Sequence, residues 1–161
     1  MTASTVARAG LLVAALGLAG ASAEAAMSPF RALAGSWAGG GIVAMANGDQ
    51  ERLRCRASYD VDGSGSAMRL NLKCASDSYN FDLSSEVEYR GGEISGGWTE
   101  ASRNASGTIK GRATGDHIEA TATGPGFSAN LSLTTRGRRQ MVTIRPQGTD
   151  ISTVSLELSR R

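Results

Sequence analysis

Hydrophobic and polar residues alternate on both sides of a glycine-rich turn in residues 51–75. A period of two is typical of half-buried β-strands. Folding the chain back about residues 63–66 places Tyr59 opposite Leu70 and Cys55 opposite Cys74. The pattern therefore predicts an antiparallel hairpin with a continuous apolar face, formed by Leu53, Cys55, Ala57, Tyr59 and Val61 before the turn and by Met68, Leu70, Leu72 and Cys74 after it.

Similar short alternating runs recur about every ten residues, as an antiparallel barrel or sandwich requires. Turn-forming pairs such as Asn47-Gly48 and Gly91-Gly92 separate the runs. Because the connections are short, we expect an all-β, antiparallel up-and-down meander of eight to ten strands that closes into a barrel and so has no free edge. A helical turn within residues 27–34 should precede the first strand. The expected strands are 36–45, 51–61, 67–75, 78–89, 93–100, 106–113, 117–123, 127–135, 140–145 and 153–158.

Residues 1–25 have the features of a cleaved secretory signal. Arg8 precedes an apolar run over residues 11–20, and small residues ending at Ala23 or Ala25 follow. The run is shorter than the roughly 20 residues that span a bilayer, so we expect cleavage instead of a membrane anchor. The mature chain, 26–161, is then a single β-barrel domain, periplasmic or secreted, and is not membrane-spanning.

The only two cysteines, Cys55 and Cys74, are expected to form a disulfide, because an exported protein meets an oxidising environment. A metal pair or a reactive thiol is the alternative, but either needs partners that the sequence lacks, with His117 as the only histidine.

Charge and composition narrow the function classes. The formal net charge is +2, and the basic residues are spread along the sequence, so no nucleic-acid partner is expected. Aromatic residues make up 5% of the chain and the outward faces are polar, which argues against an outer-membrane barrel.

The tripeptide Gly35-Ser36-Trp37, at the opening of the first expected strand, resembles the start of calycin barrels: lipocalins, avidins and small bacterial protease inhibitors. The resemblance implies that Trp37 plugs one end of the barrel and that a basic residue of the last strand, Arg160, lies over the indole. The Asn that follows the Trp in avidins is absent, and so is the C-terminal lipocalin disulfide. The resemblance therefore implies an architecture and no particular ligand.

Catalytic and metal-binding arrangements are hard to find. His117 shares a polar face with Glu119, and no Gly-x-Ser-x-Gly elbow precedes a helix. Residues 60–65 resemble the opening of an EF-hand loop, but the twelfth position is Asn71 and the flanks are strands, so a plain hairpin turn explains them equally well. We expect no enzyme activity, no cofactor and no metal.

One turn region is less easily explained by core packing. Trp98 follows two glycines and precedes Glu100 and Arg103, a combination suited to contact with an aromatic or charged group of a ligand or partner. Phe127, on an inward face, joins them as a candidate contact. The alternative is that Trp98 fills space beside small neighbours and that Glu100 pairs with Arg103 across the turn.

The sequence favours an exported, non-catalytic binding protein that holds a small hydrophobic or amphiphilic ligand. An interior of a few hundred cubic ångströms lined by Met68, Leu70, Phe127 and Leu131 would support this reading. A filled interior would favour an inhibitor that presents its loops to an extracytoplasmic hydrolase. A structural cell-envelope protein is the third possibility.

Overall fold

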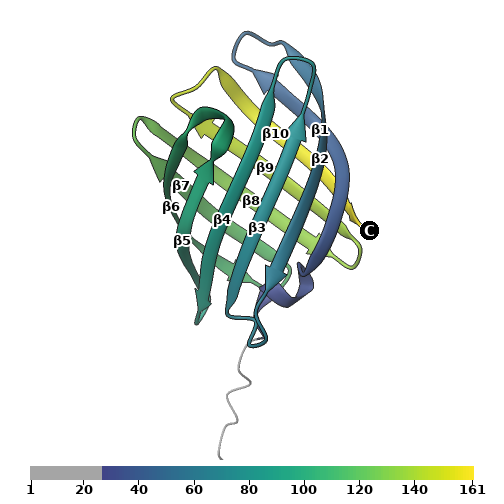
Figure 1. Ribbon diagram of the computed structural model, residues 1–161, viewed down its shortest axis with the longest axis vertical. Helices are drawn as coiled ribbons and strands as arrows, with labels where there is room; N and C mark the ends of the chain where they lie inside the picture. The colour runs from purple at the N-terminus through teal and green to yellow at the C-terminus, as the bar shows by residue number, and fades with distance from the viewer. Residues whose placement is uncertain (1–26) are drawn as a thin grey trace, which may run out of the picture.

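The computed structural model describes residues 27–161 (Figure 1). The signal expected over residues 1–25 lies outside the described residues. A short 3-10 helix, η1 (Pro29–Ala32), precedes the strands, and a second, η2 (Ala101–Arg103), lies between the fifth and sixth. The strands are β1 (Gly35–Met45), β2 (Gln50–Val61), β3 (Ala67–Ala75), β4 (Asn80–Arg90), β5 (Glu93–Glu100), β6 (Ala105–Thr114), β7 (His117–Gly124), β8 (Phe127–Arg136), β9 (Arg139–Gln147) and β10 (Ile151–Arg160).

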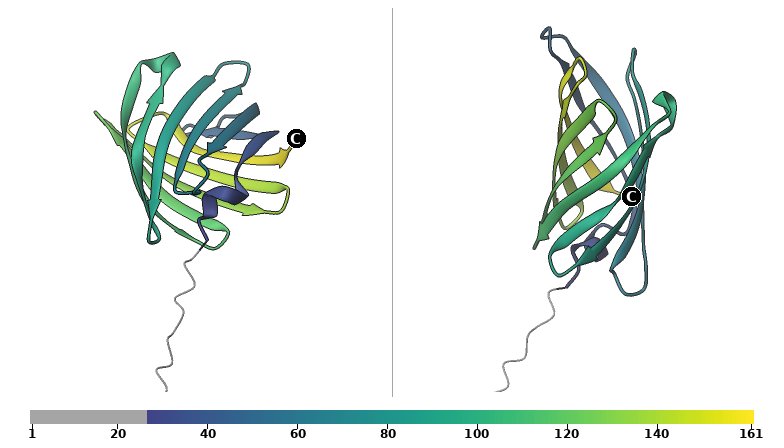
Figure 2. Two further views of the ribbon diagram at one scale, coloured as in Figure 1. Left: turned by 60° about the horizontal axis from the view of Figure 1, so that its bottom comes forward. Right: turned by 90° about the vertical axis from the view of Figure 1, so that its left-hand side faces the viewer.

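The strands form one closed antiparallel barrel in meander order (Figures 1 and 2). Each strand pairs with its neighbour in sequence, and β10 pairs with β1 to close the sheet. The predicted fold class is therefore confirmed, with ten strands. Within the described part of the chain, the helices are too short to cross a bilayer.

The hairpin of β2 and β3 has the predicted register. Tyr59 lies opposite Leu70, and Cys55 lies opposite Cys74. The two sulfurs are bonded at 2.04 Å. The expected disulfide is thus present, and it joins the middle of β2 to the end of β3 on the inner face of the barrel.

The largest differences from the expected bounds have structural reasons. β10 extends over Ile151–Arg160, beyond the expected 153–158. Its backbone pairs with β1 from Trp37 to Met45, and this pairing does not require alternating side chains. β4 begins at Asn80 and not at residue 78, because the N–H of Ser76 donates to the carbonyl oxygen of Tyr79 in a tight turn.

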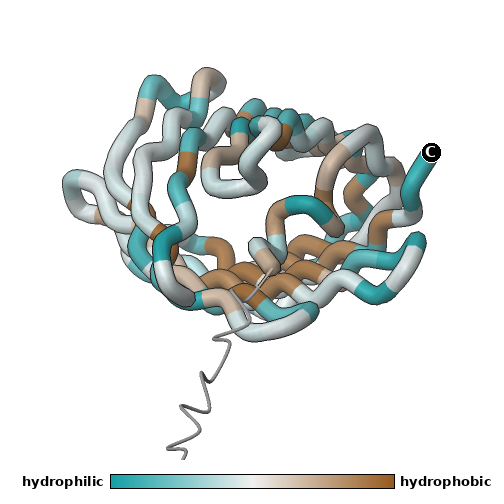
Figure 3. The backbone as a smooth tube through the Cα atoms, turned by 90° about the horizontal axis from the view of Figure 1, so that it is seen from below, coloured by the Kyte–Doolittle hydropathy of each residue, from teal (hydrophilic) through white to brown (hydrophobic). Residues whose placement is uncertain are grey.

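Side chains alternate between the barrel interior and solvent, and Figure 3 shows hydrophobic and hydrophilic positions alternating along the strands. Residues from every strand and from η1 contribute to the interior. Its most deeply buried apolar side chains are Phe30, Leu33, Trp37, Val43, Leu53 and Leu158. The segment containing η1 lies at one end of the barrel (Figure 2, left).

Candidate functional site

The segment containing η1 plugs one end of the barrel. Ser28 caps η1, because its hydroxyl oxygen accepts from the N–H of Phe30. Phe30 and Leu33 are fully buried, and Phe30 packs edge-to-face on Tyr89 with ring centroids 6.0 Å apart. The plug therefore supplies apolar side chains to the interior, although it belongs to no strand.

Trp37 and Arg160 fix this plug. The indole N–H of Trp37 donates to the carbonyl oxygen of Leu33 at 2.7 Å. The Arg160 guanidinium lies 4.7 Å from the Trp37 ring centroid and donates to the carbonyl oxygens of Ala32 and Ala34. A cation over an indole face contributes about 0.5–2 kcal/mol. One side chain from the last strand thus holds both the indole and the chain that leads into β1.

A buried polar chain lies in the barrel near the plug. The Tyr59 hydroxyl donates to Oε1 of Gln140 at 2.8 Å, and Nε2 of Gln140 donates to Oγ1 of Thr135 at 3.4 Å. Gln140 has no exposed surface. Burial raises the pKa of Tyr59 well above its ordinary value. Gln140 was not predicted as a site residue. Its period-two alternation with Val142 and Ile144 nevertheless indicates that its side chain faces the barrel interior.

An apolar cavity of about 100 Å³ lies between the plug and the middle of the barrel. Nine of the side chains that line the cavity are only partly buried. They keep accessible surface because no other side chain fills the space among them. Polar side chains in the lining are Tyr59 and Ser85, and the Ser85 hydroxyl donates to the carbonyl oxygen of Gly97 at 3.0 Å. The lining includes the predicted Met68, Leu70 and Leu131 but not Phe127, and the volume is below the few hundred cubic ångströms expected of an open interior.

Phe127 instead packs against Trp98, with ring centroids 5.5 Å apart. The Trp98 indole is buried and donates to the carbonyl oxygen of Thr123 at 3.3 Å. A Cβ atom added at Gly107 would lie 2.9 Å from Nε1 of Trp98, and one added at Gly124 would lie 3.0 Å from its Cζ2. The two glycines therefore leave room for the indole to lie against the inner wall.

Glu100 is engaged within the chain. Its carboxylate accepts from the backbone N–H groups of Asp82 and Arg103, both at 2.8 Å, and from the Ser102 hydroxyl. Burial opposes ionisation, but these hydrogen bonds and the Arg103 charge together lower the pKa of Glu100. Arg103 lies 3.5 Å from the carboxylate and 4.9 Å from the Phe81 ring centroid. The structure thus gives Trp98, Glu100 and Arg103 intramolecular contacts that match packing and pairing across the turn.

The remaining polar candidates lie on the barrel exterior or in turns. His117 contacts Thr134 at 2.9 Å and Glu119 at 3.2 Å on the outer face. Asp62 accepts from the Ser64 hydroxyl and from the N–H of Ala67, and these bonds lower its pKa. Among residues 27–161, no cluster of three or more His, Cys, Asp or Glu residues is arranged to hold a metal ion.

Comparison with known proteins adds evidence on the fold. No protein-family model matches the chain, and neither does any curated protein. Rv2717c from M. tuberculosis is similar in structure, with a TM-score of 0.62 at 16% identity over 81% of this chain and 93% of that one. The S-type phycobiliprotein lyase CPES from Guillardia theta is also similar, with a TM-score of 0.61 at 11% identity over 82% of this chain and 89% of that one. At these identities the likeness concerns the fold alone, and it places the chain among closed barrels of the same architecture.

Proposed function

We propose that the protein is an exported, non-catalytic binding protein that takes the hydrocarbon part of a small apolar or amphiphilic molecule into its barrel. The supporting observation is the unfilled cavity, whose lining is apolar apart from Tyr59 and Ser85. Both hydroxyls already donate hydrogen bonds within the protein. A ligand headgroup would find no free donor there, and burying an unpaired polar group is costly. The headgroup therefore stays outside, and only hydrocarbon enters.

The size of the cavity limits the ligand. At about 100 Å³ it is smaller than the roughly 300–1,000 Å³ of pockets that enclose drug-sized molecules. It is closer to the engineered cavity of about 150 Å³ that admits benzene. Each methylene buried there contributes about 0.8 kcal/mol, so a short chain segment gains a few kcal/mol on entry. A slim alkyl chain or a single small ring fits these limits.

The two ends of the barrel serve this function differently. Trp37 and Arg160 hold the plug, whose Phe30 and Leu33 line the cavity. Trp98 and Phe127 form an aromatic layer outside the cavity lining. In this proposal the candidate contact residues do not touch the ligand. They stabilise the part of the barrel wall next to the cavity and so maintain its shape; they are Trp98, Glu100, Arg103 and Phe127.

The alternatives have less support. An inhibitor would present loops to a hydrolase, yet the connections between strands within residues 27–161 have five residues or fewer. One structural neighbour is a lyase by name. We assign no catalysis to this chain, because the cavity lining offers two hydroxyls and no titratable acid or base near neutral pH.

A pair of substitutions on one strand tests the proposal. Ala120 lines the cavity, whereas its neighbour Thr121 faces solvent. The probe is 1-hexanol, titrated by calorimetry into oxidised protein from which bound lipid has been extracted. We expect saturable one-to-one binding, weakened about tenfold or more by Ala120→Phe, whose ring occupies the cavity, and changed less than about twofold by Thr121→Phe.

Binding that is unsaturable, or that both variants weaken equally, would contradict an interior site. If Ala120→Phe lowers the melting temperature sharply, Ala120→Leu provides the smaller filling substitution for the same titration. Native mass spectrometry of protein purified from its own host then identifies a retained ligand.

A further inference from the structure

Three arginines form a row along the outer face of β2. Arg52, Arg54 and Arg56 are all exposed and occupy alternate positions of the strand, so successive side chains are about 6.8 Å apart. We refer to them as the arginine row. None of the three forms an ion pair or a side-chain hydrogen bond with any residue in the described part of the chain. The sheet thus holds three like charges side by side without a counter-charge.

Elsewhere in the described part of the chain, six exposed arginines have carboxylate partners, whereas others such as Arg138 and Arg145 have none. Arg69 lies 2.7 Å from Glu86, and Arg136 lies 2.7 Å from Asp116. Like charges close together cost free energy that an external anion can recover. The unpaired row is therefore a distinctive feature of this surface.

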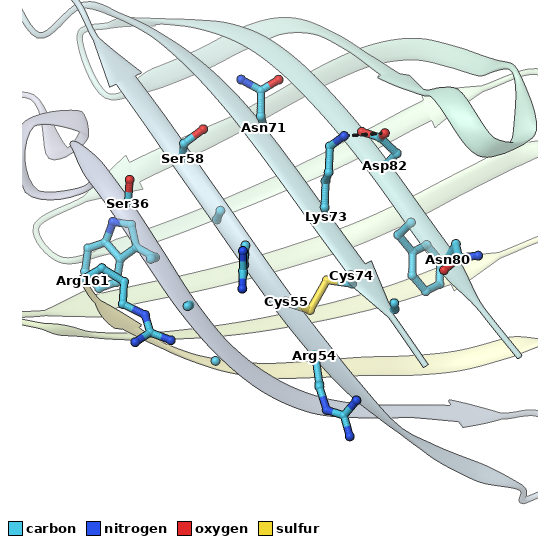
Figure 4. A pocket seen from close by; sticks show the side chains of 17 residues that line it. Ser36, Arg54, Cys55, Ser58, Asn71, Lys73, Cys74, Asn80, Asp82 and Arg161 are labelled. Carbon is cyan, nitrogen blue, oxygen red and sulfur yellow. Dashed lines mark ion pairs between the residues drawn. A yellow bond between two sulfur atoms is a disulfide. The ribbon is translucent and has the colours of Figure 1, made fainter. Parts of the chain in front are cut away.

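Arg54 and Arg56 line a groove over the outer face of β1–β4 (Figure 4), and Arg52 lines a neighbouring hollow that Arg54 also borders. On β1, Arg54 is paired with Gly40 and Arg56 is paired with Ala38. Because glycine has no side chain and that of alanine is small, the surface beside these two arginines is hollow. The groove is open and has a volume of about 1050 Å³. Its volume allows an elongated molecule to lie beside Arg54 and Arg56.

Two further cations flank the groove. Arg161 lines it at the β1 side, where its backbone N–H donates to the carbonyl oxygen of Ser36 at 2.9 Å. Lys73 lines it from β3 and pairs with Asp82 at 3.1 Å, so the charge of Asp82 is already offset (Figure 4). The groove therefore carries an excess of positive charge that the spread of basic residues along the sequence conceals.

Uncharged polar groups also converge on the groove. The side chains of Ser36, Ser58 and Asn80 line it, and none of them has a hydrogen-bond partner within residues 27–161. Asn71 accepts from the Ser84 hydroxyl at 3.1 Å, which leaves its amide N–H groups available. A ligand in the groove thus meets hydroxyl and amide groups as well as cations.

We propose that this groove binds a linear acidic polysaccharide. Guanidinium groups pair with carboxylate or sulfate through parallel hydrogen bonds, and free hydroxyl and amide groups suit sugar hydroxyls. Other polyanions fit less well. Single-stranded nucleic acid is held largely by stacking on exposed aromatic rings, but Trp37 is buried and the Phe81 ring lies under Arg103.

Membrane and protein partners are also disfavoured. Interfacial insertion relies on large apolar side chains, and protein hot spots combine arginine with large aromatic side chains such as Trp and Tyr. In residues 27–161 the exposed large hydrophobic residues are Met27 and Met141, and neither lines the groove. The groove therefore suits a ligand that is recognised by charge and hydroxyl groups.

A charge-matched pair of triple variants tests the proposal. The first carries Arg52→Gln, Arg54→Gln and Arg56→Gln, and the control removes the same charge from exposed arginines on other strands, with Arg112→Gln, Arg139→Gln and Arg145→Gln. Binding of polygalacturonate and of heparin is measured by calorimetry in low salt, so that carboxylate and sulfate are compared. We expect the first variant to bind about tenfold or more weakly and the control to stay within about twofold of the unaltered protein.

A second measurement does not depend on the variants. Phenylglyoxal modifies exposed arginines, and bound polysaccharide should protect the arginine row but not Arg112 or Arg145 in the unaltered protein, as read by peptide mass spectrometry. Equal losses in both triple variants, uniform protection, or preferential binding of DNA or anionic vesicles would overturn the proposal. Binding of 1-hexanol should be the same in all three proteins, because the groove is separate from the interior cavity.

Discussion

Replacing Tyr59 with Phe removes one hydroxyl from a polar contact that lies wholly inside the barrel. The Tyr59 hydroxyl donates to Gln140 across 81 residues of sequence, and Gln140 has no exposed surface. Tyr59→Phe therefore leaves the amide oxygen of Gln140 without its donor, in a place that water does not reach.

The cost follows from that loss. A buried polar atom deprived of its partner destabilises a protein by about 1–3 kcal/mol. Gln140→Met has a similar cost, because it leaves the Tyr59 hydroxyl unpaired. In the double variant both polar groups of the contact are gone, so we expect its loss of stability to be about 1 kcal/mol or more below the sum of the single losses.

Equilibrium unfolding in urea, with the disulfide intact, measures these differences. The four proteins of the cycle should share one m-value, so that changes in midpoint report changes in stability. Tyr59→Phe should also lower the melting temperature by about 3–5 °C per kcal/mol for a domain of this size.

Two results would refute the reasoning. One is a loss below about 0.5 kcal/mol for Tyr59→Phe, which is the range of ordinary surface changes. The other is strict additivity in the double variant, which would mean that the two side chains do not depend on each other.

Three further predictions concern other parts of the barrel. Replacing Cys55 and Cys74 together by Ser should cost about 3 kcal/mol, since the disulfide closes a loop with a sequence separation of 19, and the reduced unaltered protein should melt with this variant in a thermal scan. Arg160→Gln should cost about 1 kcal/mol or more and make Trp37 more accessible to acrylamide quenching, whereas unchanged quenching would contradict its role over the indole. Because burial raises the pKa of Tyr59, the folded state keeps it protonated where the unfolded chain ionises; urea titrations should show stability falling above about pH 10, and Tyr59→Phe should lack this component.

Local pattern was sufficient to predict the hairpin and most strand ends. In β2 and β3 a slip of one residue would turn Tyr59 and Leu70 to solvent, so alternation and the glycine turn together determine the register.

Features that depend on distant parts of the chain were not predictable in this way. Trp98 has room because Gly107 and Gly124, from two later strands, lie against its indole. The alternation of residues along β2 places the arginine row on one face of the strand. Only the folded sheet shows that Ala38 and Gly40 of β1 lie beside it. Only the folded sheet shows that no carboxylate within residues 27–161 lies close enough to form an ion pair with it. Side-chain composition along one strand says nothing about which strand lies opposite.

The pairing of β1 with β10 makes completion of the barrel depend on contact between its first and tenth strands. The seam joins positions more than a hundred residues apart, and contacts of such long range form late and slowly. Until the seam closes, both of its strands present unpaired backbone groups that can join another chain. Removal of β10 should therefore open the sheet and produce self-association through the exposed edges of β1 and β9.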